Sequence, residues 1–372
     1  MSALSRMASF DDDIDFRKVW RVGLAISAVL IAISAWAIIG RGVVLGIDFE
    51  GGTSWDVPTE TLSVADARDA LRSLDEAGAK VQTIGRGSSR ILRVQSATDD
   101  VEKQGEISDA LAEAANVEVT DISVSTVGPS WGDQVTEKAQ RALVFFFIAI
   151  ALYMAIRLEW KMAVGALVSV VHDLLISVGF YAALQIEVTP ATVIAFLTIL
   201  GYSLYDTIVV FDRMHENTAR LSAGSKATYT DTVSLSLNQV LMRSINTTIT
   251  SLLPVIALLI VGSSFLGAAA LREFALALLV GMTSGAFSSI MIAAPLVAWI
   301  KEREPRYREL RLRVAALQGP AGGSVRGAVL GPADLDPDAS PIPVPRRPVA
   351  GAPPALSGRS IPPRPRKKGK KR

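Results

Sequence analysis

Six strongly apolar stretches recur along the chain, separated by polar and charged residues. Because a helix rises about 1.5 Å per residue, about 20 apolar residues suffice to cross the hydrocarbon core of a bilayer. Most connections between the stretches are short, the exceptions being the one after the first stretch and residues 213–244. The predicted spans are 22–39, 142–156, 162–184, 190–211, 245–261 and 274–300. The pattern predicts a polytopic α-helical membrane protein with six transmembrane helices.

The long segment between the first two spans has the pattern of a small α+β domain. Alternating polar and apolar positions predict strands over 51–58, 80–85, 89–96 and 121–128. Helices are expected over 63–78, where Ser63 and Asp66 have the spacing of a capping box, and over 101–115. The order β-α-β-β-α-β is that of a ferredoxin-like unit, a fold that assigns no function by itself.

These elements divide the chain into five parts. They are an N-terminal segment (1–21), the first helix (22–40), the α+β domain (41–138), helices two to six (139–302) and a tail (303–372). The tail is rich in Pro, Gly and basic residues and poor in bulky apolar ones, so we expect it to be disordered. Its basic end favours anionic membrane lipids, while a solvated tail, or one that binds a ribosome or another partner, fits the same composition.

Composition narrows the function further. Charged residues make up 20% of the chain, whereas soluble proteins carry about 25%. The absence of cysteine excludes disulfides, thiolate metal sites and thiol nucleophiles, and two histidines leave little room for a metal site or an imidazole-based triad. No nucleotide-binding loop or nucleophile elbow is visible in the sequence. We therefore expect no enzyme, no cofactor, no metal and no nucleic-acid partner.

Charge is distributed unevenly, and the distribution predicts an orientation. Residues 41–138 contain 18 Asp and Glu against 9 Lys and Arg. Basic residues near the span ends collect on the other side, and positive loops mark the cytoplasmic face. Those residues are Arg6, Arg17, Lys18, Arg21, Arg157, Lys161, Arg213, Arg220, Lys226 and the tail. We expect both termini to be cytoplasmic and the α+β domain to be extracytoplasmic.

An acidic residue, Asp206, lies inside the fourth apolar span, after Gly201, which we expect to serve helix packing. A carboxylate near the middle of a membrane helix costs ~2.5–3.5 kcal/mol on insertion scales, and such residues usually lie on ion pathways. Arg243 begins the fifth span, within a stretch (236–251) whose many Asn, Gln, Ser and Thr residues indicate contact with other helices or water. We interpret Asp206 and Arg243 as a candidate proton relay; a static ion pair between them is the structural alternative.

A second charged point, His172 and Asp173, lies near the middle of the third span. Histidine titrates near neutral pH, and an adjacent acid could exchange protons with it. Neighbouring residues point about 100° apart on a helix, however, so the two side chains need not touch. We include both in the candidate relay, with hydrogen bonding for packing as the alternative.

Four motifs together resemble the SecD/SecF family of bacterial protein-export proteins, part of the resistance-nodulation-division superfamily. They are GIDFEGGT (46–53) after the first span, HD (172–173) in the third, GYSLYDTIVVFDR (201–213) in the fourth and LNQVLMRSINTT (237–248) in the fifth. The likeness covers about residues 15 to 300 in the same order. The tail lies outside it.

The resemblance implies six helices that form half of a twelve-helix SecD–SecF unit beside the SecYEG channel in the bacterial cell membrane. It also implies proton flow that moves the outer domains and helps to draw a polypeptide, delivered through the SecA pathway, across the membrane. By position, Asp206 matches the acidic residue of the family's fourth-helix motif and Arg243 the arginine of its fifth-helix motif. Tyr205 and His215 stand where many relatives have Asn and Arg, which puts local hydrogen bonding in doubt.

Two other functions stay open at this point. One is a proton-coupled exporter of small molecules from the same superfamily, although its pumps have twelve helices and larger paired domains. The other is a scaffold that only stabilises the channel, with Asp206 and Arg243 as a structural pair. The sequence does not separate a scaffold from a motor.

Overall fold

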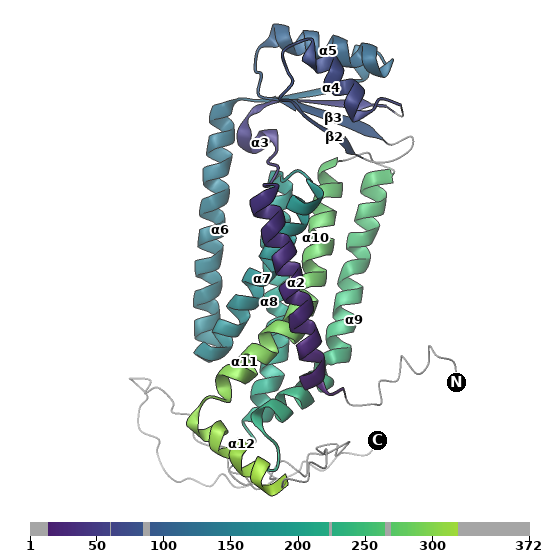
Figure 1. Cartoon of the computed structure of the whole chain (residues 1–372). Helices are drawn as coiled ribbons and strands as arrows, with labels where there is room; N and C mark the ends of the chain where they lie inside the picture. The colour runs from purple at the N-terminus through teal and green to yellow at the C-terminus, as the bar shows by residue number, and fades with distance from the viewer. Residues whose placement is uncertain (1–13, 60, 85–89, 223–224, 265–268, 319–372) are drawn as a thin grey trace, which may run out of the picture.

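The protein is an upright helical bundle that carries a small α+β domain at one end (Figure 1). This computed structural model describes residues 14–59, 61–84, 90–222, 225–264 and 269–318. Six of its helices are long and apolar enough to cross a membrane, which confirms the predicted architecture. They are α2 (Phe16–Gly40), α6 (Pro129–Arg157), α7 (Trp160–Leu184), α8 (Pro190–Thr218), α9 (Tyr229–Ser264), and a sixth that joins α10 (Ala269–Ser288), a π-helical turn η3 (Ser289–Ala293) and α11 (Ala294–Lys301).

Two helices extend well beyond the apolar stretches that predicted them. Helix α6 begins at Pro129 rather than near residue 142, and α9 begins at Tyr229 rather than near residue 245. Apolar residues mark only the part of a helix that meets lipid, whereas backbone hydrogen bonding continues into the polar turns. At the start of α6 a proline occupies the first turn, where its missing N–H costs nothing.

The α+β domain has the predicted ferredoxin-like order of elements. Its strands pair antiparallel in the order β2-β3-β1-β4, and the helix start predicted at Ser63 and Asp66 is a capping box. The elements are β1 (Gly52–Pro58), α4 (Val64–Arg72), β2 (Lys80–Ile84), β3 (Ile91–Ser96), α5 (Val101–Ala115) and β4 (Ser123–Val127). The turn expected between β2 and β3 lies outside the described residues.

The two faces of this sheet have different partners. Helices α4 and α5 cover the face that points away from the bundle (Figure 1), where Trp55, Leu92 and Val94 are fully buried. Because side chains alternate along a strand, the residues between them point to the other face. Those residues include Asp56 and Arg93, directly paired on β1 and β3, and they face the ends of the membrane helices.

The glycine pair after the first span forms the joint between the domain and the bundle. A short helix, α3 (Ile47–Glu50), leads into Gly51 and Gly52, whose φ angles are 78° and 105°. This left-handed region favours glycine. A Cβ on Gly51 would lie 2.8 Å from the Cα of Pro129. The segments by which the chain enters and leaves the domain are therefore packed backbone against backbone, with no room for side chains.

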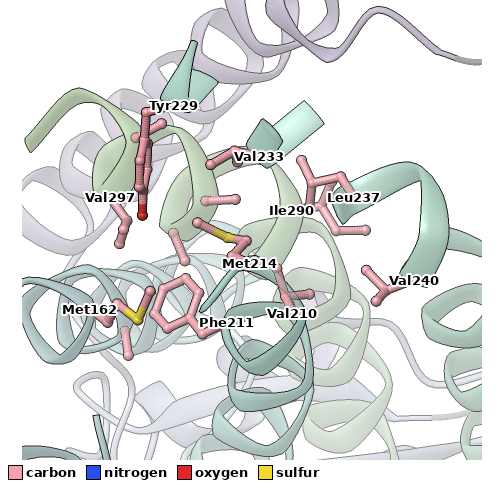
Figure 2. Close-up of a cluster of buried hydrophobic side chains, with 14 of the residues drawn as sticks. Met162, Val210, Phe211, Met214, Tyr229, Val233, Leu237, Val240, Ile290 and Val297 are labelled. Carbon is pink, nitrogen blue, oxygen red and sulfur yellow. The ribbon is translucent and has the colours of Figure 1, made fainter. Parts of the chain in front are cut away.

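The end of the bundle away from the domain has its own apolar core. Helices α7, α8 and α9 and the η3–α11 segment all contribute to it, and the labelled side chains of Figure 2 converge there. Phe211 and Met214 of α8 are fully buried at its centre, against Met162 of α7 and Val297 of α11. This packing holds the part of α8 that lies between Asp206 and the end of the bundle away from the domain.

Close approach of α8 and α10 depends on glycines of α10, not of α8. A Cβ on Gly281 would meet the side chain of Ile199, and one on Gly285 would lie 2.9 Å from the Cβ of Ser203. Gly201, which we expected to serve helix packing, is exposed, and a Cβ added to it would have no neighbour within 4 Å. The expectation for Gly201 is therefore wrong within this chain.

Part of the expected tail is folded. Residues Pro305–Gln318 form α12, which lies at the end of the bundle opposite the domain (Figure 1). Tyr307, Leu310 and Val314 bury one side of this helix, and the rings of Tyr307 and Tyr229 are 4.7 Å apart. The numerous arginines obscured this apolar spacing in the sequence. Residues 319–372, with the predictions of disorder and lipid contact, lie outside the described part.

Candidate functional site

Asp206 lies on the inner face of α8 and is held by hydroxyl groups from two other helices. The Ser244 Oγ of α9 donates to both carboxylate oxygens, at 2.9 and 3.0 Å, and the Ser289 Oγ of η3 also donates to Oδ2. Asp206 is 6% exposed. A carboxylate thus lies near mid-span among neutral donors, where its charge has no bonded counter-ion in the described part of the chain.

Arg243 is not the bonded partner of Asp206. It precedes Ser244 on α9, but its side chain is exposed, and the described residues show no ion pair between it and the carboxylate. Neighbouring residues on a helix point in different directions, so Ser244 faces α8 while Arg243 faces outward. The static pair that served as the structural alternative is therefore absent from the described part of this chain.

The outward face around Arg243 is polar at membrane depth. Tyr205 of α8 is 58% exposed. Asn246 and Thr250, which follow Arg243 on α9, are also exposed. Because Ser244 bonds Asp206, Arg243 lies at nearly the same depth as that carboxylate. An arginine exposed to lipid at the centre of a bilayer costs ~2.5–3.5 kcal/mol on insertion scales. This face is suited to contact with another protein rather than with lipid.

Asp173 is more deeply enclosed than Asp206. It is fully buried, and three hydroxyl groups donate to it: Ser203 of α8 at 2.6 Å, and Ser284 and Ser288 of α10 at 2.8 and 2.7 Å. The His172 Nδ1 lies 3.1 Å from its Oδ1, so these neighbours do touch. The Nε2 of His172 makes no hydrogen bond within the described residues. Asp173 thereby joins three helices at one point.

The two carboxylates are connected through consecutive serines. Ser288 donates to Asp173 and Ser289 to Asp206, and these serines lie where α10 passes into the π-helical turn η3. Single π-helical turns are often found at functional sites. Each serine bonds its own carboxylate, and the described residues show no hydrogen bond between the two serine hydroxyls. The structure thus places all the predicted titratable residues except Arg243 in an interior network of two adjacent hydrogen-bonded groups, one around Asp173 and one around Asp206.

A layer of apolar side chains separates this network from the domain end of the bundle. Phe196 and Ile199 of α8 and Leu278 and Met282 of α10 are all buried in one cluster. Gly281 brings the two helices into contact at Ile199. The layer lies between the interior acids and the domain end of the bundle.

Sequence reasoning missed the serines that hold both carboxylates. The signal was present in the polar stretch around Ser244 and in TSGAFSS (283–289), a group of hydroxyl and small residues inside the sixth apolar span. Spacing along one helix could not show which carboxylate each serine meets. The described residues contain no group of three His, Cys, Asp or Glu that could hold a metal ion.

Comparison with known proteins points to one family. A family described as "Protein export membrane protein SecD/SecF, C-terminal" matches residues 106–303, and one described as "SecD/SecF GG Motif" matches residues 36–61. The second match contains Gly51 and Gly52, the glycines of the joint.

Individual relatives agree with these family matches. The chain is 43% identical over 317 residues to protein translocase subunit SecF of Streptomyces coelicolor, covering 85% of this chain and 83% of the relative. It is 38% identical over 306 residues to SecF of Mycobacterium tuberculosis, covering 80% and 69%.

The fold is similar to that of a solved structure. A crystal structure of SecDF, a translocon-associated membrane protein from Thermus thermophilus, superposes with a TM-score of 0.69 at 34% identity. The match covers 79% of this chain but only 39% of the SecDF chain. A second SecDF structure, in a super-membrane-facing form, gives a TM-score of 0.56 at 31% identity, covering 82% and 40%.

Proposed function

The chain belongs to the SecD/SecF family of protein-export membrane proteins, and we propose that it uses proton movement through Asp206 to promote export. It is a multi-pass membrane protein with a role in protein transport, on the SecF side of the family. Protons would be the coupling ion. No enzymatic step and no cofactor is part of the proposal.

The observation that carries this proposal is the environment of Asp206. A structural ion pair would place a base against the carboxylate, but neutral hydroxyls of Ser244 and Ser289 occupy that place. Hydrogen bonds support the charged form of an acid while burial opposes it, so a modest change in packing alters its protonation. This is what a group that must gain and lose a proton requires.

The energy available from protons is sufficient for such a role. Each proton that crosses the membrane carries about 2.3 kcal/mol per 100 mV of membrane potential. Two packings of the same helices can differ by only a few kcal/mol, so one or two protons can switch between them. The helices α8, α9 and η3, which meet at Asp206, are the elements whose contacts would change.

The polar outer face of α8 and α9 supports a partner within the membrane. We propose that a SecD protein covers Tyr205 and Arg243, because the SecDF chain that resembles this one is about twice as long. In that unit Arg243 would reach the relay from the interface. The SecYEG channel, SecA and the translocating polypeptide would be the wider partners, in a bacterial cell membrane with both termini cytoplasmic.

The interior acids have separate proposed roles. Asp206 is the relay. Asp173, with four bonded neighbours, holds α7, α8 and α10 together and keeps the serine connection aligned. His172 is the candidate for proton exchange beside it, through the Nε2 atom that makes no hydrogen bond in the described residues.

Proton flux in sealed vesicles tests the function directly. Vesicles that contain this chain with its SecD partner and the channel should acidify faster than vesicles with the Asp206→Asn variant. Asp212→Asn, an exposed carboxylate nearly two turns closer to the helix end, is the matched control and should conduct normally. Equal flux with and without Asp206 would favour the scaffold. Flux that depends on an added small solute would favour an exporter.

A further inference from the structure

An ionic cluster also joins the α+β domain to the bundle, beside the short helix α3 that leads into the glycine joint. Arg93 of β3 bonds Asp56 through Nε and Nη2, at 2.7 and 2.9 Å. Its Nη1 lies between two carboxylates of the bundle, 3.2 Å from Glu187 in the α7–α8 turn and 3.3 Å from Glu273 in α10. Gln95 of the sheet also donates to Glu187, at 2.8 Å, and Thr189 donates to Glu273, at 3.1 Å.

The charges in this cluster do not balance. Burial raises the pKa of the Asp48 carboxyl of α3, and the positive charge of Arg93 only partly offsets this rise. With Arg272, which lines the adjoining cleft, two guanidinium groups face four carboxylates. Burial opposes the charge on Arg93, but the hydrogen bonds and charge of Asp56, with Glu187 and Glu273, outweigh it and raise the pKa of Arg93. The excess charge is therefore negative.

Water has a route to these carboxylates. A cleft of about 290 Å³ opens between β2 and the domain end of the bundle. It is lined by Gln82–Ile84 on one side and by the α7–α8 turn, Arg272 and Glu273 on the other. Glu273 thus borders the outer solution while its carboxylate is largely covered by Arg93 and Thr189. Protons can reach it without crossing the apolar layer of Phe196 and Ile199.

The domain is consequently attached at two places of unlike character. The glycine joint is a close backbone contact, in which a Cβ on Gly132 would lie 2.8 Å from the carbonyl oxygen of Phe49. The Arg93 cluster is a set of charged hydrogen bonds with no chain connection. Opening the cluster leaves the joint intact, so the domain can tilt about the joint.

We propose that the Arg93 cluster is a proton-controlled latch, closed when Glu273 holds a proton and released when Glu273 is ionised. Burying an uncompensated charge is costly, so the closed cluster with four ionised carboxylates is unfavourable. In the open form Glu187 and Glu273 meet water, and Asp56 stays with Arg93 on the sheet. The closed form therefore binds one proton more tightly than the open form. By linkage, proton uptake closes the latch and proton loss opens it.

The latch deepens the proposed function and in this respect rests on it. A proton that arrives from outside at Glu273 would close the domain onto the bundle. Its passage inward, toward the serines and Asp206, would leave the cluster ionised and release the domain. Each proton would then produce one cycle of domain movement.

Distance measurement between two spin labels tests the latch without any export assay. The chain contains no cysteine, so Glu113→Cys on α5 and Thr198→Cys on α8, both exposed, would carry the only labels. Full-length protein in nanodiscs would be examined from about pH 5 to about pH 9, a range that begins just above the ordinary pKa of a glutamate. We expect one distance at the acid end and a second population, with the domain displaced, that grows as the pH rises.

Variants show whether the Arg93 cluster itself produces the movement. Glu273→Gln and Glu187→Gln should stay closed over the whole range, and Arg93→Gln should be mostly open at neutral pH. Glu76→Gln, which breaks an ion pair with Lys103 inside the domain, should behave as wild type. Asp206→Asn should keep the wild-type response even where it stops proton flux, so the two proposals can fail separately. A wild-type distance that does not change with pH, or a Glu273→Gln variant that responds as wild type does, would overturn the latch.

Discussion

Asp206 and Asp173 are both buried carboxylates within membrane-spanning helices, and both are held by serines. Asp173 is fully enclosed, with three hydroxyl donors from two other helices and a histidine from its own. Asp206 has two hydroxyl donors and lies behind the polar face that carries Tyr205 and Arg243. Two buried carboxylates on packed membrane helices therefore have unlike surroundings.

The difference indicates which acid can change its protonation at a moderate cost. Moving the Asp173 carboxylate would break bonds to α8 and α10 at once, so its position is tied to the packing of three helices. Asp206 bonds Ser244 of α9, the helix that also carries the exposed Arg243, and a shift of α9 alone removes this donor. We therefore propose Asp206 as the carrier of the moving proton and Asp173 as the structural junction.

The largest expected effect is that of Asp206→Asn on export. Asn is nearly isosteric and forms hydrogen bonds, but it cannot titrate, and it removes the cost of a buried charge. The variant should insert and fold at least as well as wild type, yet export should fall to the level seen without the protein and should no longer respond to membrane potential. Asp206→Glu keeps a titratable group displaced by about one methylene and should be partly active. An Asn variant that still responds to the proton gradient would contradict this assignment.

Arg243→Ala should lower export nearly as far. The two side chains are not bonded in this chain, so the expected coupling arises from a shared step at the partner interface. In a double-mutant cycle the combined variant should be little worse than either single one. Co-purification with SecD should persist. Additive losses would show that Arg243 acts independently, and loss of SecD binding would make it an interface residue alone. Asn246→Ala, on the same exposed face, is the control and should be mild.

Asp173→Asn should affect stability rather than the response to protons. The Asn amide replaces one acceptor oxygen with an NH₂ group, which faces hydroxyl groups that themselves donate. At least one buried polar group is then left without an acceptor, which costs about 1–3 kcal/mol of stability. Thermal unfolding in detergent should show a lower midpoint for this variant and no lowering for Asp206→Asn. If Asp173→Asn were as stable as wild type but inactive, Asp173 would belong to the relay and the contrast between the two acids would be wrong.

The smallest effects come from two consecutive serines that serve as controls for each other. Ser289→Ala removes a donor from Asp206, and a hydrogen bond to a charged group is worth about 1.5–3 kcal/mol, or about tenfold to 150-fold in rate. Export should fall by less than that, with unchanged stability. Ser288→Ala removes a donor from Asp173 and should lower the free energy of unfolding by about 1 kcal/mol, with normal export per folded molecule. Identical behaviour of the two variants would show that the serines belong to one undivided network.

Much of the architecture followed from hydrophobic spacing. The six helices and the order of the domain elements were predictable because lipid contact requires long apolar runs and strands require alternation. The helix α12 was not predicted, since Tyr307, Leu310 and Val314 are dispersed among arginines and find their apolar surface only on α9 and its neighbours. Gly201 was assigned to packing although the glycines that permit contact with α8 are on α10.

Unusual residues could be recognised from the sequence alone: a carboxylate in an apolar helix, a His-Asp pair in another, and a glycine pair where the chain enters the domain. Each of these is energetically costly at its position in the sequence, and a single segment is enough to show it. The contacts of each residue, by contrast, depend on how the whole chain folds. Ser244 rather than Arg243 faces Asp206, and Arg93 reaches Glu187 and Glu273 from residues far apart in the chain. Side-chain direction and helix register set these contacts, and both depend on how the helices pack against each other, which no single segment contains.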